Sequence, residues 1–272
     1  MRATRYADYR QAMLAGLAAY QQRRFAGRDV LFEPSPATRL TFSPGAAHRN
    51  LFDPALYHDL AHRPPSLRQM TSARALAISV FGTLARREDL GLLSEALCTD
   101  GQPIIPAGEA RQALSLTLQG VTGVDLWLSG PRLRLAVAPY FLERSLDSCK
   151  TDRRGHCPGM AECDDLAWLN HRVAECPLRR LSGLIHPLRA LAADPMADAV
   201  ISRRLLLVCD ARNPAFAPAG RLSRLLAELQ QALPPPFALQ RTTWQAINAP
   251  MARSPWYSDL LAFLKDKYGI DS

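Results

Sequence analysis

The sequence has 272 residues, of which 48% are hydrophobic, so we expect a sizeable core and exclude a wholly disordered chain. No apolar run approaches the roughly 18–20 residues that a membrane-spanning helix needs, and the first residues lack the layout of a secretion signal. We therefore expect a cytoplasmic protein that does not bind a membrane, built as a single domain over residues 1–272.

The formal net charge of +8 favours a polyanionic partner such as nucleic acid. Of the 33 basic residues only Lys150, Lys265 and Lys267 are lysine, and the arginine fork suits phosphate oxygens better than an ammonium group does. The same arginine excess is also typical of a GC-rich genome. Charge alone therefore leaves nucleic-acid binding undecided.

The first part of the chain, residues 1–98, places apolar residues at helical spacing between proline-rich stretches, and we expect it to be mostly helical. Asp53-Pro54 is a helix start signal, whereas Pro64-Pro65 ends the short helix that it begins. The predicted helices cover residues 5–24, 54–63, 66–86 and 88–98. The buried stripe of the third of these consists of Met70, Ala73, Leu76, Ala77 and Val80.

Beyond residue 98 the hydrophobic pattern changes to period two, which predicts strands. Strands are expected over residues 113–118, 124–128 and 133–137, as a three-stranded meander, and again over 205–208 and 237–243. The continuous apolar run Leu205–Val208 is typical of a strand covered on both faces. Helices are expected over residues 164–173, 178–192, 219–233 and 255–268, the last ended by Gly269. The pattern predicts an α/β fold with a mixed sheet flanked by helices.

A cysteine-rich segment, residues 149–176, interrupts this pattern. Its cysteines have the spacing C-x7-C-x5-C-x12-C and are Cys149, Cys157, Cys163 and Cys176. Four thiolates suit a structural zinc ion or an iron–sulfur cluster. Zinc fingers usually contain C-x2-C pairs, which are absent here, so ordinary core cysteines remain an equal alternative. Cys98 and Cys209 fall in predicted elements and are interpreted as core.

His58 and His62 lie one helical turn apart, which would allow both imidazoles to bind one zinc ion. Asp59 stands where zinc proteases carry glutamate, and no third zinc ligand follows at the sequence spacing that is typical of such sites. A solvated helix end is the simpler interpretation.

Asp125 opens the second strand of the meander, and the third strand leads to Glu143. Asp on one strand, with Glu-x-Lys on the next, is the active-site layout of PD-(D/E)XK nucleases, in which the two carboxylates hold Mg²⁺. The sequence resembles a bacterial, restriction-endonuclease-like branch of that superfamily. The segments that carry the resemblance are MTSARALAISVFGTL (70–84), LVCDARNP (207–214), TTWQ (242–245) and FLKDKYG (263–269).

The sequence departs from the family pattern at the catalytic positions. Ala138 and Tyr140 occupy the places of the Glu and the Lys, which leaves Asp125 as a remnant and makes a Mg²⁺ site unexpected. Arg74 and Ser79 replace a Gln and an Asn of the family helix. Glu143 lies an odd number of residues after Ala138, so we expect it to face the other side of the strand.

Three functions remain open. The resemblance implies a catalytically defective nuclease homologue that binds DNA or RNA, in a defence or nucleic-acid-processing complex, through Arg74, Arg132 and Arg134. The second is an active Mg²⁺-dependent nuclease, in which Glu109 or Asp147 joins Asp125. The third is a protein-interaction subunit that does not bind nucleic acid, because a fold does not fix a function.

The cysteine segment yields a direct test. If its four cysteines bind a structural metal, elemental analysis should find about one zinc per chain, or several irons with a brown colour. Cys163→Ser should then lose the metal, whereas Cys98→Ser should keep it. A metal-free protein whose melting temperature is unchanged by chelator would reject the site.

Overall fold

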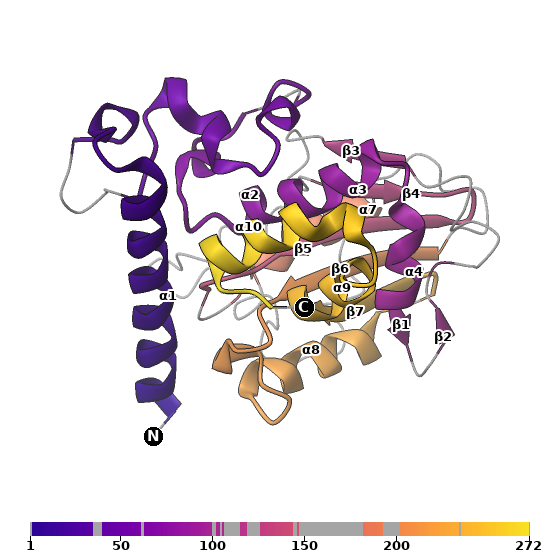
Figure 1. Cartoon of the computed structure of the whole chain (residues 1–272). Helices are drawn as coiled ribbons and strands as arrows, with labels where there is room; N and C mark the ends of the chain where they lie inside the picture. The colour runs from indigo at the N-terminus through magenta and orange to yellow at the C-terminus, as the bar shows by residue number, and fades with distance from the viewer. Residues whose placement is uncertain are drawn as a thin grey trace.

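The computed structural model describes residues 2–34, 40–60, 63–99, 102–103, 105, 115–118, 126–143, 146, 182–192, 202–233 and 235–271. Within these ranges, five strands form one mixed sheet and helices lie against it (Figure 1). The α/β class with a mixed sheet flanked by helices is therefore confirmed.

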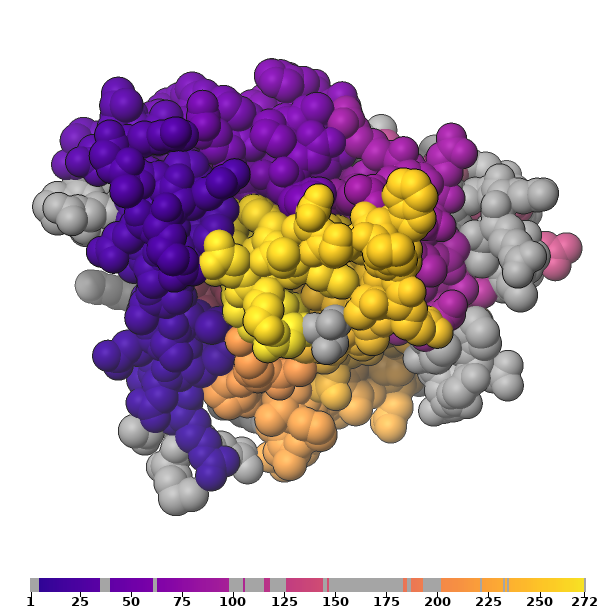
Figure 2. Space-filling model, viewed as in Figure 1, coloured from indigo at the N-terminus to yellow at the C-terminus, as the bar shows by residue number. Residues whose placement is uncertain are grey.

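The described N-terminal residues form one long helix and several shorter ones. Helix α1 (Arg2–Phe25) fits the helix expected over 5–24 and lies along one flank of the molecule, beside the C-terminal helix (Figures 1 and 2). Short 3₁₀ helices follow as η1 (Asp29–Leu31), η3 (Pro44–Asn50), η4 (Pro54–Tyr57) and η5 (Pro65–Arg68), so the helix expected over 54–63 extends only to Tyr57. Asp53 caps η4 by accepting a hydrogen bond from the Ala55 amide at 2.9 Å, as the Asp-Pro signal indicates.

The long helix begins later than predicted. It starts at Ala73 rather than at residue 66, because η5 ends at Arg68, Gln69 is extended and the Met70 amide donates to Leu40 O at 2.8 Å instead of continuing a helix. Ser72 then caps the helix through the Ala75 amide. The helix runs continuously as α2 (Ala73–Ala77), a π-helical turn η6 (Ile78–Gly82) and α3 (Thr83–Arg86). The predicted stripe from Met70 to Val80 is buried throughout.

The five strands have the order β3-β4-β5-β6-β7. The first three, β3 (Ser115–Leu118), β4 (Leu126–Ser129) and β5 (Leu133–Pro139), form the predicted antiparallel meander. Strands β6 (Ser202–Cys209) and β7 (Phe237–Thr243) then add in parallel to β5. Parallel neighbours place their carboxyl ends at one edge of the sheet, which positions the segments that follow them side by side.

Helices cover both faces of the sheet. On one face lie α2, α3, α4 (Leu93–Ala96), α9 (Trp244–Met251) and α10 (Ser258–Tyr268). On the other face lie α7 (Ile185–Ala192) and α8 (Arg221–Ala232). Because side chains alternate along a strand, Leu206 and Val208 enter the first core while Leu205 and Leu207 enter the second. All four are fully buried, as expected for a strand covered on both faces.

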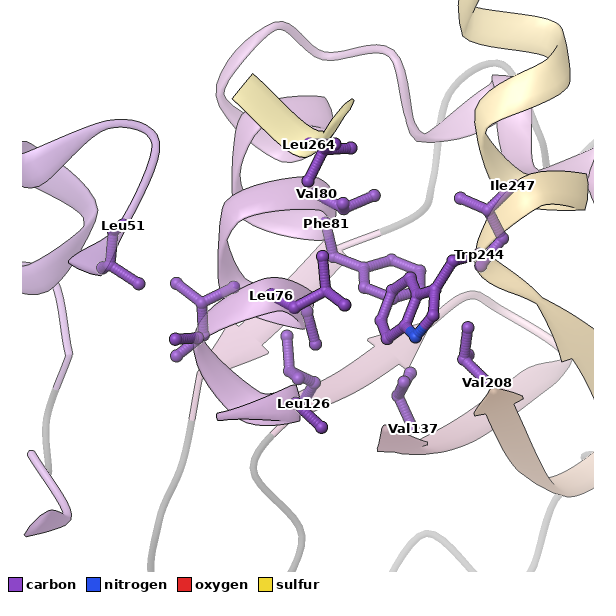
Figure 3. Packing of buried hydrophobic residues seen from close by; sticks show 14 of the residues in the cluster. Leu51, Leu76, Val80, Phe81, Leu126, Val137, Val208, Trp244, Ile247 and Leu264 are labelled. Carbon is purple, nitrogen blue, oxygen red and sulfur yellow. The ribbon is translucent and has the colours of Figure 1, made fainter. Parts of the chain in front are cut away.

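The larger core centres on Trp244. Its indole lies beside Phe81, with ring centroids 6.3 Å apart, over Val137 and Val208 of the sheet (Figure 3). Thr243 caps α9 through the Ala246 amide. The sequence analysis did not predict this helix.

Short elements complete the described fold. They are η7 (Leu90–Leu92), the hairpin of β1 (Cys98–Thr99) and β2 (Gln102–Pro103), η10 (Ser182–Leu184), η11 (Pro214–Phe216) and η12 (Pro255–Tyr257). Helix α10 ends at Gly269, whose φ of 61° lies in the left-handed region that glycine adopts without strain.

Lys267 of α10 is fully buried. Its ammonium group donates to the backbone oxygen and the side-chain oxygen of Asn50, at 2.5 and 2.6 Å. Asn50 in turn donates to Leu67 O and Gln69 O, both at 2.7 Å. Burial lowers the pKa of Lys267 well below its usual value. This pair of residues joins the C-terminal helix to the segment that leads into α2.

The depressed pKa of Lys267 predicts a pH dependence. The unfolded chain holds this proton up to about pH 10.4, whereas the folded chain releases it at a lower pH, so the free energy of unfolding should rise with pH from the folded pKa of Lys267 up to about pH 10. Lys267→Met should remove that part of the rise, which chemical denaturation at several pH values would measure. Lys265→Met, at an exposed position of the same helix, should keep the wild-type slope of unfolding free energy against pH. Equal slopes in all three proteins would contradict a lowered pKa for Lys267.

Candidate functional site

The candidate site lies at the carboxyl ends of β5, β6 and β7. Three segments leave the sheet there, beginning at Tyr140, Asp210 and Trp244. In α/β sheets this edge is where ligands usually bind, because strand ends and loops converge on it.

A buried carboxylate, Asp210, is the centre of this edge. Its side chain is 0% exposed. One oxygen accepts from the Arg212 amide at 3.0 Å and from Gln245 Nε2 at 2.9 Å. The other lies 2.7 Å from Arg212 Nη2 and 3.0 Å from the Tyr9 hydroxyl. Burial alone raises the pKa of Asp210, but the hydrogen bonds from Arg212 and Gln245 outweigh it and hold that pKa below its usual value.

The groups around Asp210 also hold the turn that follows β5. The Tyr9 hydroxyl lies 2.9 Å from Phe141 O. Asn213 Nδ2 donates to Phe141 O and to Glu143 O, at 3.1 and 3.0 Å. Trp244 Nε1 donates to the backbone oxygen of Tyr140 at 3.0 Å. The turn over residues 140–143 is thus fixed by side chains from α1, from the loop after β6 and from α9.

Three of the sequence segments that carry the family resemblance therefore meet at one place. Residues 207–214 supply Asp210 and Arg212, and residues 242–245 supply Gln245. The guanidinium of Arg212 continues to the last segment, with Nη1 2.6 Å from Gly269 O and Nη2 3.1 Å from Tyr268 O. These segments hold the frame of the site, and the charges of Asp210 and Arg212 are paired with each other.

A cleft of about 470 Å³ opens beside this turn. It is lined by α1, by residues 66–74, by the end of β5 with its turn, and by η10 and α7. Its basic side chains are Arg10 of α1 and Arg74 of α2. The hydroxyl-bearing side chains beside them are Ser66, Thr71 and Ser72. Such a lining suits an anion whose oxygens accept hydrogen bonds.

Several residues singled out in the sequence line this cleft. Ala138 and Tyr140, which the resemblance aligns with a Glu and a Lys, both do so, as does Arg74. Arg74 Nη1 donates to Ser66 Oγ at 3.3 Å. Burial, and then the neighbouring Glu143, raise the pKa of the Tyr140 hydroxyl. Tyr140 is therefore a neutral phenol at physiological pH and cannot supply the positive charge of a lysine.

Arg132 and Arg134 lie elsewhere. They are at the start of β5, where Arg134 is opposite Ser129 of β4 and Arg203 of β6. Arg132 and Arg134 precede Ala138 by six and four residues. In an extended strand these separations correspond to about 20 and 13 Å. The structure does not bring them together with Arg74, so they can form only a separate contact surface.

Glu143 corrects one expectation. Alternation along the strand predicts that its side chain faces the other side, but β5 ends at Pro139 and alternation ends with it. Glu143 instead lines the cleft, and its carboxylate accepts a hydrogen bond from the Phe141 amide in the turn. Burial raises the pKa of Glu143, which the backbone donors of residues 141–143 only partly offset. The prediction was wrong because the local pattern does not show where the strand ends.

Other candidates are not brought into the site. Ser79 is 0% exposed and donates to Ala75 O at 2.8 Å, inside the long helix. His58 is an exposed residue at the end of η4, and its proposed partner His62 lies outside the described residues. Also outside them are Glu109, Asp125, Asp147, Cys149, Cys157, Cys163 and Cys176. Among the residues that the structure does describe, no group of three or more His, Cys, Asp or Glu side chains could hold a metal.

No family model, curated protein or solved structure matches this chain. Among the described helices, none has the length and the apolar character needed to cross a membrane.

Asp210 predicts a measurable loss of stability. Asp210→Asn keeps the shape but removes the charge paired with Arg212, and should lower the free energy of unfolding by about 2 kcal/mol at pH 7. The folded pKa of Asp210 lies below the unfolded value of about 3.9. The stabilisation by the charged carboxylate is therefore fully present above about pH 3.9 and is lost as the pH falls through the folded pKa. The difference between the two proteins should therefore shrink below about pH 4.

The matched control for this substitution is Asp8→Asn, at an exposed position on α1. Urea unfolding at pH 7 and pH 3 measures all three proteins. An Asp210→Asn protein as stable as Asp8→Asn at pH 7 would contradict the central role of this carboxylate.

Proposed function

We propose that this protein binds nucleic acid through phosphate contacts in the cleft beside β5 and does not cleave it. The observation that carries the proposal is the lining of the cleft. Arg10 and Arg74 enter it from two separate helices, while Ala138 and Tyr140 stand where a nuclease of the resembled family has its Glu and Lys. Removing acidic groups from such a cleft also removes repulsion of phosphate.

The sheet topology supports a restriction-endonuclease-like fold as part of this proposal. An antiparallel meander, a helix on one face and then a parallel strand follow one another as β3, β4, β5, α7 and β6. The residues that replace the catalytic pair lie at the end of the third meander strand, next to the helix that carries Arg74. This is the arrangement that the resemblance implies for the site.

Glu143 bears on the alternative of an active nuclease, because it adds a carboxylate to the cleft. Its oxygens accept backbone amides of its own turn, and burial raises its pKa. A carboxylate in that state is a poor ligand for Mg²⁺, which prefers several free, charged oxygen ligands. We therefore favour binding without metal-dependent cleavage.

Salt dependence and mutation test the binding. Each phosphate that an arginine neutralises releases a counterion, so affinity for DNA or RNA should fall steeply as salt rises. Arg74→Ala should weaken binding for all sequences and reduce the slope of log affinity against log salt by about 1, with little loss of stability. Fluorescence anisotropy at several salt concentrations measures both quantities.

The control variant is Arg224→Ala, at an exposed position of α8, which should leave affinity and slope unchanged. Incubation of the same nucleic acids with Mg²⁺ or Mn²⁺ should give no cleavage. Cleavage that disappears in Asp125→Ala would favour the active nuclease, and no binding even at low salt would favour a protein-interaction subunit.

A further inference from the structure

The lining of the cleft combines two kinds of side chain. Arg10, Arg74 and the hydroxyl-bearing residues between 66 and 72 are cationic or polar. Leu14, Val137, Pro139, Leu142 and Pro187 have side chains without polar atoms. A ligand that matches this lining has both an anionic group and a flat or apolar body. A nucleotide has this composition.

The size of the cleft limits how much nucleic acid enters it. Its volume of about 470 Å³ lies in the range of pockets for single small molecules. A duplex, whose major groove alone is about 12 Å wide, cannot enter and can only lie across the opening. The part that enters is therefore about one nucleotide of a single strand.

The charge of the cleft favours a strand end over an internal phosphate. An internal phosphodiester carries one negative charge, whereas a terminal phosphate monoester carries about −1.5 to −2 at pH 7 and presents three acceptor oxygens. The two positive charges of the Arg10 and Arg74 guanidinium groups match the doubly charged group better. Glu143 is the acidic residue that lines the cleft, and its carboxylate already accepts hydrogen bonds from backbone amides of its own turn.

We propose that the cleft binds the phosphorylated end of a single nucleic-acid strand, with the terminal phosphate on Arg10 and Arg74 and the last nucleoside against apolar side chains of the lining. This inference rests on the proposed function and specifies its substrate. The terminal phosphate is the recognised group, and it occurs at either a 5′ or a 3′ end.

The test compares strands that differ only at their ends. The full chain is titrated with an internally labelled single strand of one sequence, carrying a 5′-phosphate, a 3′-phosphate or hydroxyl groups at both ends, and with the same sequence as a closed circle. One of the two phosphorylated strands should bind about tenfold more tightly than the hydroxyl strand, and the circle no more tightly than the hydroxyl strand. Which strand gains identifies the end.

Charge-removing variants locate the effect. Arg10→Gln and Arg74→Gln should each reduce the preference for the phosphorylated strand, and the double variant should abolish it. Arg224→Gln, at an exposed position of α8 outside the cleft, should retain it. Melting temperatures of the variants confirm that they are folded, which is expected since Arg10 is exposed and Arg74 is only partly buried.

The outcomes separate the two proposals. Equal, salt-sensitive binding of all four strands would overturn the end recognition and leave the binding function standing. A preference that persists in the double variant would also overturn it, because the phosphate would then be held elsewhere. Absence of binding to every strand at low salt would overturn both.

Discussion

The buried carboxylate of Asp210 is the constraint on which the rest of the site depends. A charge removed from water must be paired and hydrogen-bonded, or the fold loses several kcal/mol. Asp210 meets this requirement by gathering donors from Tyr9, Arg212 and Gln245. These residues belong to α1, the loop after β6 and α9, so satisfying one charge fixes the relative positions of three elements.

The same group of residues also positions the turn that lines the cleft. Arg212 reaches the end of α10 through two backbone oxygens, and Asn213 and Trp244 hold the turn after β5. Tyr140 and Glu143 therefore line the cleft from a turn whose backbone has little freedom. Sites held in this way bind without first having to be ordered, which favours affinity.

The sequence predicted the meander, the doubly covered strand β6 and the N-terminal and C-terminal helices, because their periodicity is strong and their apolar faces have a core to meet. It also predicted that Arg74, Ala138 and Tyr140 share a site, through the resemblance. It did not predict α9, whose Pro250 lies in its last turn and whose first residue, Trp244, directly follows β7. Nor did it predict the late start of the long helix at Ala73, since the competing backbone contact comes from Leu40, thirty residues earlier. The position of Glu143 was missed for the same reason: a strand end is set by tertiary contacts that a local pattern does not contain.

The bond between Tyr9 and Asp210 spans 201 residues of sequence, and Arg23 pairs with Asp266 across a similar span. Long-range contacts of this kind are slow to form, because much chain entropy is lost before they contribute. The edge of the sheet beside the cleft is complete only when Tyr9, Asp210 and Gln245 have come together, so this edge should be among the last parts of the fold to form.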